Sequence, residues 1–178
     1  PLHGFGLNQV RAPGEMRNDP ASAIADAIAA MKFFPYHGAV SQPLVLPAYE
    51  SDRYWTAVRV PETADVKDLW EPARFGFASE LARAFVFRGD ARYFAVFRTL
   101  VERFALENPP FQGVQAQSAQ EMALRLIQIS FAASVFAGEV PGFPDSVFER
   151  MLERFAREVI SAVLARRDYA IAQNNNHW

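Results

Sequence analysis

The feature that most constrains the fold is a pair of S-x-x-E sequences, each placed directly before a run with helical periodicity. Ser118-Ala119-Gln120-Glu121 and Ser146-Val147-Phe148-Glu149 both match the capping box, in which the two side chains satisfy free N–H groups of a first helical turn. The first predicts a helix to about Ala137 with Gly138 as its stop. The second predicts a helix whose inward residues are Val147, Met151, Phe155, Val159 and Val163.

Similar signals mark further helices on both sides of these two. Pro20 follows Asp19, a pairing typical of a helix start. Pro72 is expected to open a helix that ends at Gly89, and Asp90 to cap the next one. Asn108-Pro109-Pro110 stops that helix, because proline lacks a donor and clashes with the preceding turn. Its predicted inward residues are Tyr93, Phe94, Phe97, Leu100, Val101 and Phe104.

Short connections between helices predict antiparallel helical hairpins and an all-α fold. Because the hairpins have no evident closing partner, we expect them to form part of an incomplete (α/α) toroid or of a superhelix. We divide the chain into a lead-in, residues 1–64, and the front part of the helical domain, residues 65–178. The lead-in combines loop, one helix and the strand-like stretch "RYWTAVRV", residues 53–60. Because the chain starts at Pro1 and stops inside a polar cluster, we expect it to be a fragment.

Composition excludes several classes of function. The net charge of −2 offers no basic field for nucleic acid. The absence of cysteine excludes disulfides and thiolate metal sites, and the three histidines show no metal-binding spacing. No apolar run approaches the roughly 18 residues of a membrane span. We therefore expect no metal or other cofactor within this chain, and no membrane span, although a metal elsewhere in a longer protein stays open.

Three segments resemble the heparinase II/III-type polysaccharide lyases. "DVKDLWEPARF", residues 65–75, is similar to that family's D-[IV]-K-x-x-W-E-x-[SA]-R-F segment. "ENPPFQGVQAQSAQEMALRL", residues 107–126, is similar to its N-P-P-x-x-G…E-x-x-x-R segment. "YAIAQNNNHW", residues 169–178, is similar to its N-N-H element, and the order and spacing of all three agree. The family often has a tryptophan after the glycine, where this chain has Val114-Gln115-Ala116-Gln117, so its substrate is expected to differ.

The resemblance implies an N-terminal α/α toroid followed by β-sheet domains, with an acidic polysaccharide bound between them. It implies a bacterial periplasmic or secreted lyase acting on heparan sulfate-like, heparin-like or alginate-like polymers. The family's catalytic tyrosine and a further histidine lie downstream of the Asn-His element. We therefore expect these 178 residues alone to be inactive.

Lyases of this kind remove the C5 proton of a uronate and expel the C4 oxygen. Removal adds negative charge beside a carboxylate, so donors must stabilise the developing anion, and losing one such donor typically costs about 3–4 kcal/mol of barrier. By position, the resemblance assigns Asn176 as carboxylate neutraliser and His177 as a second donor, with Asn175 and Gln173 supporting them. Asparagine also tolerates the left-handed conformation at helix ends, so the cluster could instead be a helix cap.

Further candidate substrate-binding residues lie in the first two segments, and each has a structural alternative. Glu71 and Arg74 share a helix face and could simply pair with each other. Trp70 is either a core aromatic or a platform for a sugar ring. Glu121 closes the capping box and is expected to pair with Arg125, four residues further on. Gln120 and Arg125 are candidates for either a structural or a substrate-binding role.

Two other functions compete with the lyase. A glycoside hydrolase on an α/α barrel would need two opposed carboxylates, for which Glu71 and Asp68 are candidates. A non-catalytic carbohydrate-binding helical domain would keep a pocket without turnover.

Overall fold

The structure, a computed structural model, describes residues 20–38, 40–47, 54–60, 62–63 and 65–172. Within these residues it contains six α-helices and one two-stranded antiparallel sheet, so the predicted all-α class is confirmed. The helices are α1 (Pro20–Ala29), α2 (Val66–Ala73), α3 (Ala78–Arg88), α4 (Ala91–Glu107), α5 (Ala119–Glu139) and α6 (Ser146–Ala172). The strands are β1 (Lys32–Phe33) and β2 (Gln42–Pro43), and the 3-10 turns are η1 (Pro35–His37), η2 (Trp55–Ala57) and η3 (Val114–Ala116).

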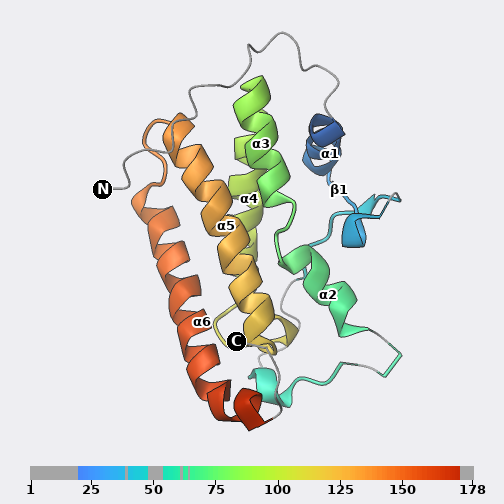
Figure 1. Cartoon of the computed structure of the whole chain (residues 1–178), viewed down its shortest axis with the longest axis vertical. Coiled ribbons are helices and arrows are strands. Elements are labelled where there is room, and N and C mark those ends of the chain that lie inside the picture. Colours follow the sequence, from blue (N-terminus) through green and yellow to red (C-terminus); the bar gives the residue numbers. More distant parts are fainter. Residues whose placement is uncertain (1–19, 39, 48–53, 61, 64, 173–178) are drawn as a thin grey trace.

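Helix α5 is the central element of the bundle (Figure 1). It packs against α6 on one side and α3 on the other, while α4 lies behind them. Helix α1 covers α3 and contributes Ala25 and Ile28 to the same core as the later helices. The described part of the lead-in is thus packed onto the bundle.

The centre of the core is made of phenylalanine rings. Phe136 of α5 stacks on Phe97 of α4 with ring centroids 4.9 Å apart, and it also meets Phe85 and Phe94. Such aromatic pairs add to the gain from burying apolar area. The predicted inward residues of α4 are confirmed, since all are buried except Phe94, which is partly buried.

Several predicted helix ends are confirmed. Helix α1 begins at Pro20. Asp90 accepts from the Arg92 N–H at 2.9 Å, and Ser118 accepts from the Glu121 N–H at 3.3 Å. Gly89 follows α3 with φ 65°, the left-handed conformation in which glycine escapes the penalty of a side chain.

The prediction that Pro72 opens a helix was wrong. Asp65 caps α2 seven residues earlier by accepting from the Lys67 N–H at 2.9 Å, and Pro72 lies in the last turn. The helix ends at Ala73, so the proline interrupts little hydrogen bonding beyond its own turn. Phe75 then takes φ 59°, which separates α2 from α3.

Two predictions around α5 and α6 were also wrong. Helix α5 continues through Gly138 to Glu139, since Gly138 does not adopt a positive φ. The Asp145 carboxylate, not Ser146, caps α6 by accepting from the N–H groups of Val147 and Phe148 at 3.1 and 3.0 Å. Of the predicted inward residues, Phe155 is buried and Met151, Val159 and Val163 are partly buried, as expected. Val147 is the exception, since it is 50% exposed and its neighbour Phe148 is buried instead.

The stretch predicted as a strand is not one in its described part. Trp55–Ala57 forms the 3-10 turn η2, and only Tyr54 makes a bridge, with Gln112. The Gln117 side-chain amide donates to the carbonyls of Trp55 and Val58 at 3.3 and 3.0 Å. A side chain therefore satisfies these carbonyls where a neighbouring strand would otherwise be needed.

Candidate functional site

Residues 65–75 and 107–126 form one hydrogen-bonded unit. The Trp70 indole N–H donates to the Val114 carbonyl at 3.0 Å, and the Gln115 amide donates to the Leu69 carbonyl at 3.1 Å. The Arg125 Nε donates to the carbonyl of Ala73 at 2.7 Å. Helix α2, turn η3 and the start of α5 are thereby fixed together.

Arg74 lies between two carboxylates in this unit. It makes a two-pronged contact with Glu121, including Nη2 to Oε1 at 2.8 Å, and it also pairs with Glu71. The predicted Glu71–Arg74 pair is thus confirmed. Hydrogen bonding to Glu121, with the charges of both glutamates, raises the pKa of Arg74 above its ordinary value. The Arg74 guanidinium stays charged and is held on two sides.

The predicted Glu121–Arg125 helix pair was wrong. The Glu121 carboxylate turns to Arg74, and Arg125 is only 5% exposed. Besides Ala73, Arg125 donates to the backbone and side-chain oxygens of Gln115, and its guanidinium lies 4.4 Å from the centre of the Phe104 ring. Burial lowers the pKa of Arg125 to about 10. Arg125 therefore has a structural role, since it joins α5 to α2 and η3.

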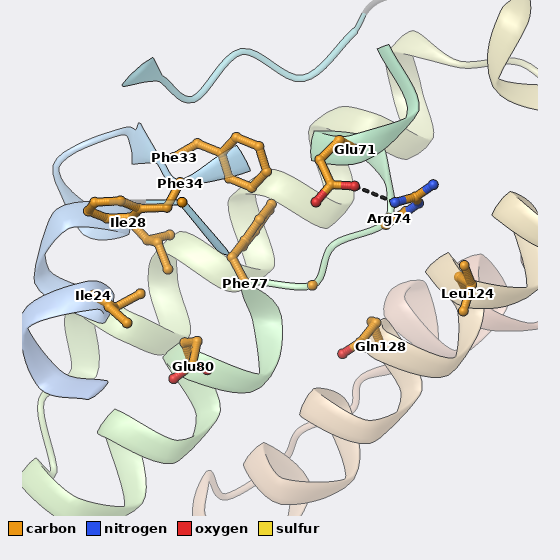
Figure 2. A pocket seen from close by; sticks show the side chains of 12 residues that line it. Ile24, Ile28, Phe33, Phe34, Glu71, Arg74, Phe77, Glu80, Leu124 and Gln128 are labelled. Carbon is orange, nitrogen blue, oxygen red and sulfur yellow. Dashed lines mark hydrogen bonds and ion pairs between the residues drawn. The ribbon is translucent and has the colours of Figure 1, made fainter. Parts of the chain in front are cut away.

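A cavity of about 350 Å³ opens beside the Glu71–Arg74 pair (Figure 2). It is bounded by α1, β1 and the residues that follow it, the α2–α3 junction and α5. Its apolar side is formed by Ile24, Ile28, Phe33, Phe34, Phe77 and Leu124. Its polar side chains are Glu71, Arg74, Glu80 and Gln128. Its size is within the range of small-molecule sites.

The segment after β1 adopts a costly backbone conformation next to this cavity. Tyr36 has φ 52°, its N–H donates to Glu71 Oε1 at 3.2 Å, and its hydroxyl donates to Asp68 at 2.9 Å. Partial desolvation, followed by the bond to Asp68, raises the pKa of Tyr36 to about 12, although the residue is 53% exposed. Such strain is often retained near ligand sites.

The cavity contains only part of the predicted site. Glu71 and Arg74 line it, whereas Trp70, Gln120 and Arg125 do not. Gln120 is partly exposed in the first turn of α5. Gln173, Asn175, Asn176 and His177 lie outside the described residues.

The last described turns of α6 contact the unit formed by residues 65–75 and 107–126. Arg166 donates to the Ala116 carbonyl at 2.7 Å, and its guanidinium lies 4.0 Å from the centre of the Trp55 ring. Ala162 is buried with Ala116, Ala119 and Met122. The helix that leads to the Asn-His element therefore ends near η2 and η3.

Sequence reasoning missed most of the cavity lining. Phe33 and Phe34 precede a proline in "KFFPYHG", which gives no hint of a ligand, and Gln128 lies almost a hundred residues later on α5. Only packing of α1 and α5 on the same helix, α3, brings them to one cavity.

Comparison of the chain with protein-family models, with curated proteins and with solved structures found no match. Among the described helices, α5 alone has the length and apolar composition of a membrane span, a property that helices in a protein core share. In the described part of the chain, no three His, Asp or Glu side chains gather as a metal site would require.

Proposed function

We propose that this chain is the front part of the α/α toroid of a polysaccharide lyase, which cleaves uronic-acid-containing polymers by β-elimination. The observation that carries the proposal is the ordered set of three family-like segments at residues 65–75, 107–126 and 169–178. The hydrogen bonds that join the first two segments support it, because residues shared with the family then serve one local structure.

In this proposal Asn176 and His177 hold the uronate carboxylate and stabilise the charge that develops when the C5 proton leaves. An asparagine amide donates without acting as a base, while imidazole can donate or exchange a proton. Gln173 and Asn175 support these two groups. The proton itself is taken by residues outside this chain, so the 178 residues alone are expected to be inactive.

A glycoside hydrolase is the second candidate, with Glu80 in place of Asp68 as the partner of Glu71. Glu71 and Glu80 line the same cavity, whereas Asp68 does not line it and accepts from the Tyr36 hydroxyl. A hydrolase needs such a pair, one acid and one base or nucleophile. Each of the two already pairs with an arginine, Arg74 and Arg83 respectively, which favours a structural or binding role over acid–base work.

The test uses the protein expressed from its complete reading frame, incubated with heparan sulfate, heparin and alginate. The ultraviolet absorbance of the unsaturated uronate product is followed for the native protein and for Asn176→Ala. We expect absorbance to grow with at least one polymer, and Asn176→Ala to lower the rate by roughly a hundredfold or more.

Two results would contradict the lyase. Release of reducing ends without ultraviolet absorbance would indicate a hydrolase, and Glu71→Gln and Glu80→Gln would then be the variants to compare. Retained binding of polymer with neither signal would indicate a carbohydrate-binding domain. Unfolding curves of the native protein and Asn176→Ala must coincide for the rates to be compared.

A further inference from the structure

The cavity beside Glu71 has an apolar wall facing a polar rim (Figure 2). Phe33, Phe34 and Phe77 form the wall together with isoleucines of α1, and Glu71 and Gln128 lie across from them on α2 and α5. A pyranose ring has the matching character, since its C–H face is apolar and its edge carries hydroxyls. Aromatic side chains with a few placed polar groups are the usual lining of small-molecule sites. Here Phe33 and Phe77 meet edge to face, with their ring planes at 79°.

The charges of the lining argue against an anion in this cavity. Two carboxylates, Glu71 and Glu80, line it with a single guanidinium, that of Arg74. Arg74 is also bound by Glu121 from the α5 side, and Glu80 pairs with Arg83. Three carboxylates are thus matched by two guanidinium groups, and one negative charge is left over. A bound carboxylate or sulfate would be repelled at short range by like charges, and burial strengthens that repulsion.

Hydrogen-bonding capacity remains for hydroxyl groups. The Gln128 side chain has no hydrogen-bond partner among the described residues, and it is partly buried at the cavity. An ionised carboxylate has about four acceptor positions, of which the contacts to Tyr36 and Arg74 occupy part on Glu71. The rim can thus both donate and accept, which a polyol needs and a purely apolar ligand does not.

We propose that this cavity binds an uncharged sugar ring, with its apolar face on Phe33, Phe34 and Phe77 and its hydroxyls on Gln128 and Glu71. The choice of a sugar rests on the proposed function, whereas the exclusion of acidic ligands rests on the charges of the cavity alone. Uronate recognition then belongs elsewhere in the protein. This cavity selects the neutral residues of a polymer that combines them with uronates, which alginate, made of uronates alone, does not.

Binding is measured on the protein from its complete reading frame by saturation-transfer NMR and calorimetry. The probes are methyl glucoside and N-acetylglucosamine, both uncharged, and glucuronic acid. We expect an uncharged sugar to bind at least about tenfold more tightly than glucuronic acid at low ionic strength. Gln128→Leu, which removes the amide at nearly constant size, is expected to weaken that binding roughly tenfold.

Gln112→Leu is the matched control, because Gln112 is also partly buried but does not line this cavity. Phe34→Ala tests the wall independently should Gln128→Leu fail to fold. Equal or tighter binding of glucuronic acid, no binding of an uncharged sugar, or binding unaffected by both Gln128→Leu and Phe34→Ala would each overturn the proposal.

The ultraviolet assay keeps this outcome separate from that of the lyase. Unsaturated product without binding of an uncharged sugar would refute the cavity proposal and leave the lyase in place. Binding of an uncharged sugar without unsaturated product from any polymer would refute the lyase and leave the cavity proposal in place.

Discussion

Arg74 and Arg125 show that the same residue type takes different roles in different surroundings. Arg74 is 28% exposed at its side chain and lies between carboxylates beside a cavity. Arg125 is buried and contacts mainly backbone and amide oxygens. Arg74 borders the cavity of about 350 Å³, whereas Arg125 borders a space of only about 10 Å³.

Replacing Arg125 by methionine should destabilise the fold strongly. Methionine keeps most of the volume but leaves the Ala73 carbonyl and Gln115 without their donor. Glu158 is then left with Arg154 alone as a nearby positive charge. Removing one partner from a buried charged network costs about 3–5 kcal/mol. The free energy of unfolding in urea measures this loss.

Arg157→Met provides the matched comparison for that experiment. Arg157 is 75% exposed and pairs with Glu153 within the same helix. Exposed pairs of this kind contribute less than about 0.5 kcal/mol. If the two substitutions lowered the free energy of unfolding by similar amounts, the buried contacts of Arg125 would not matter to stability.

At the scale of elements, the starts of helices depend on which of two neighbouring side chains reaches the free N–H groups. At α6 both Asp145 and Ser146 are suitable caps by residue type. Asp145 is chosen because its carboxylate reaches two N–H groups and also pairs with Arg98 of α4 at 2.7 Å. The deciding contact comes from another helix.

Two glycine substitutions should have opposite effects on stability. Gly89→Ala forces a side chain into a left-handed conformation and should destabilise the protein by about 1 kcal/mol. Gly138→Ala places alanine within α5 and should stabilise it by about 0.5 kcal/mol.

Neither added methyl group meets an atom within 4 Å, so backbone conformation alone separates the two variants. Thermal unfolding followed by circular dichroism measures both shifts. A stabilising Gly89→Ala, or a destabilising Gly138→Ala, would show that the assigned end of α3 or α5 is misplaced.

At the scale of the whole molecule, the described lead-in and the helical bundle share one core. Ile28 of α1 is 1% exposed and belongs to the same cluster as Leu81 of α3 and Phe136 of α5. Shared burial couples the stability of α1 to that of the bundle.

Ile28→Ala should therefore lower the stability of the entire unit by about 2–4 kcal/mol. Tryptophan fluorescence and far-ultraviolet circular dichroism should report a single, coincident urea transition in both native protein and variant. Ile160→Ala on α6, at a position 59% exposed, should change it by less than about 1 kcal/mol. A separate early transition confined to part of the helical signal would mean that α1 unfolds independently.

The sequence alone determined the helical class, the starts at Pro20, Asp90 and Ser118, and the inward face of α4. These features depend on local hydrogen bonds and on the helical period of 3.6 residues. Both involve residues within about two helical turns of one another in the sequence. In α6 the periodicity was right for Phe155 and wrong at Val147, which is exposed while Phe148 is buried. The cap there is Asp145 and not Ser146.

Only the tertiary structure decided what the charged residues contact and where a cavity lies. Glu121 satisfies the capping pattern in sequence, yet Arg74, 47 residues away, takes its carboxylate. Phe34 and Gln128 border one cavity because α1 and α5 pack on the same helix. Such contacts depend on long-range packing. A charged side chain that could bond to several groups in its own helix pairs instead with a group that packing places beside it.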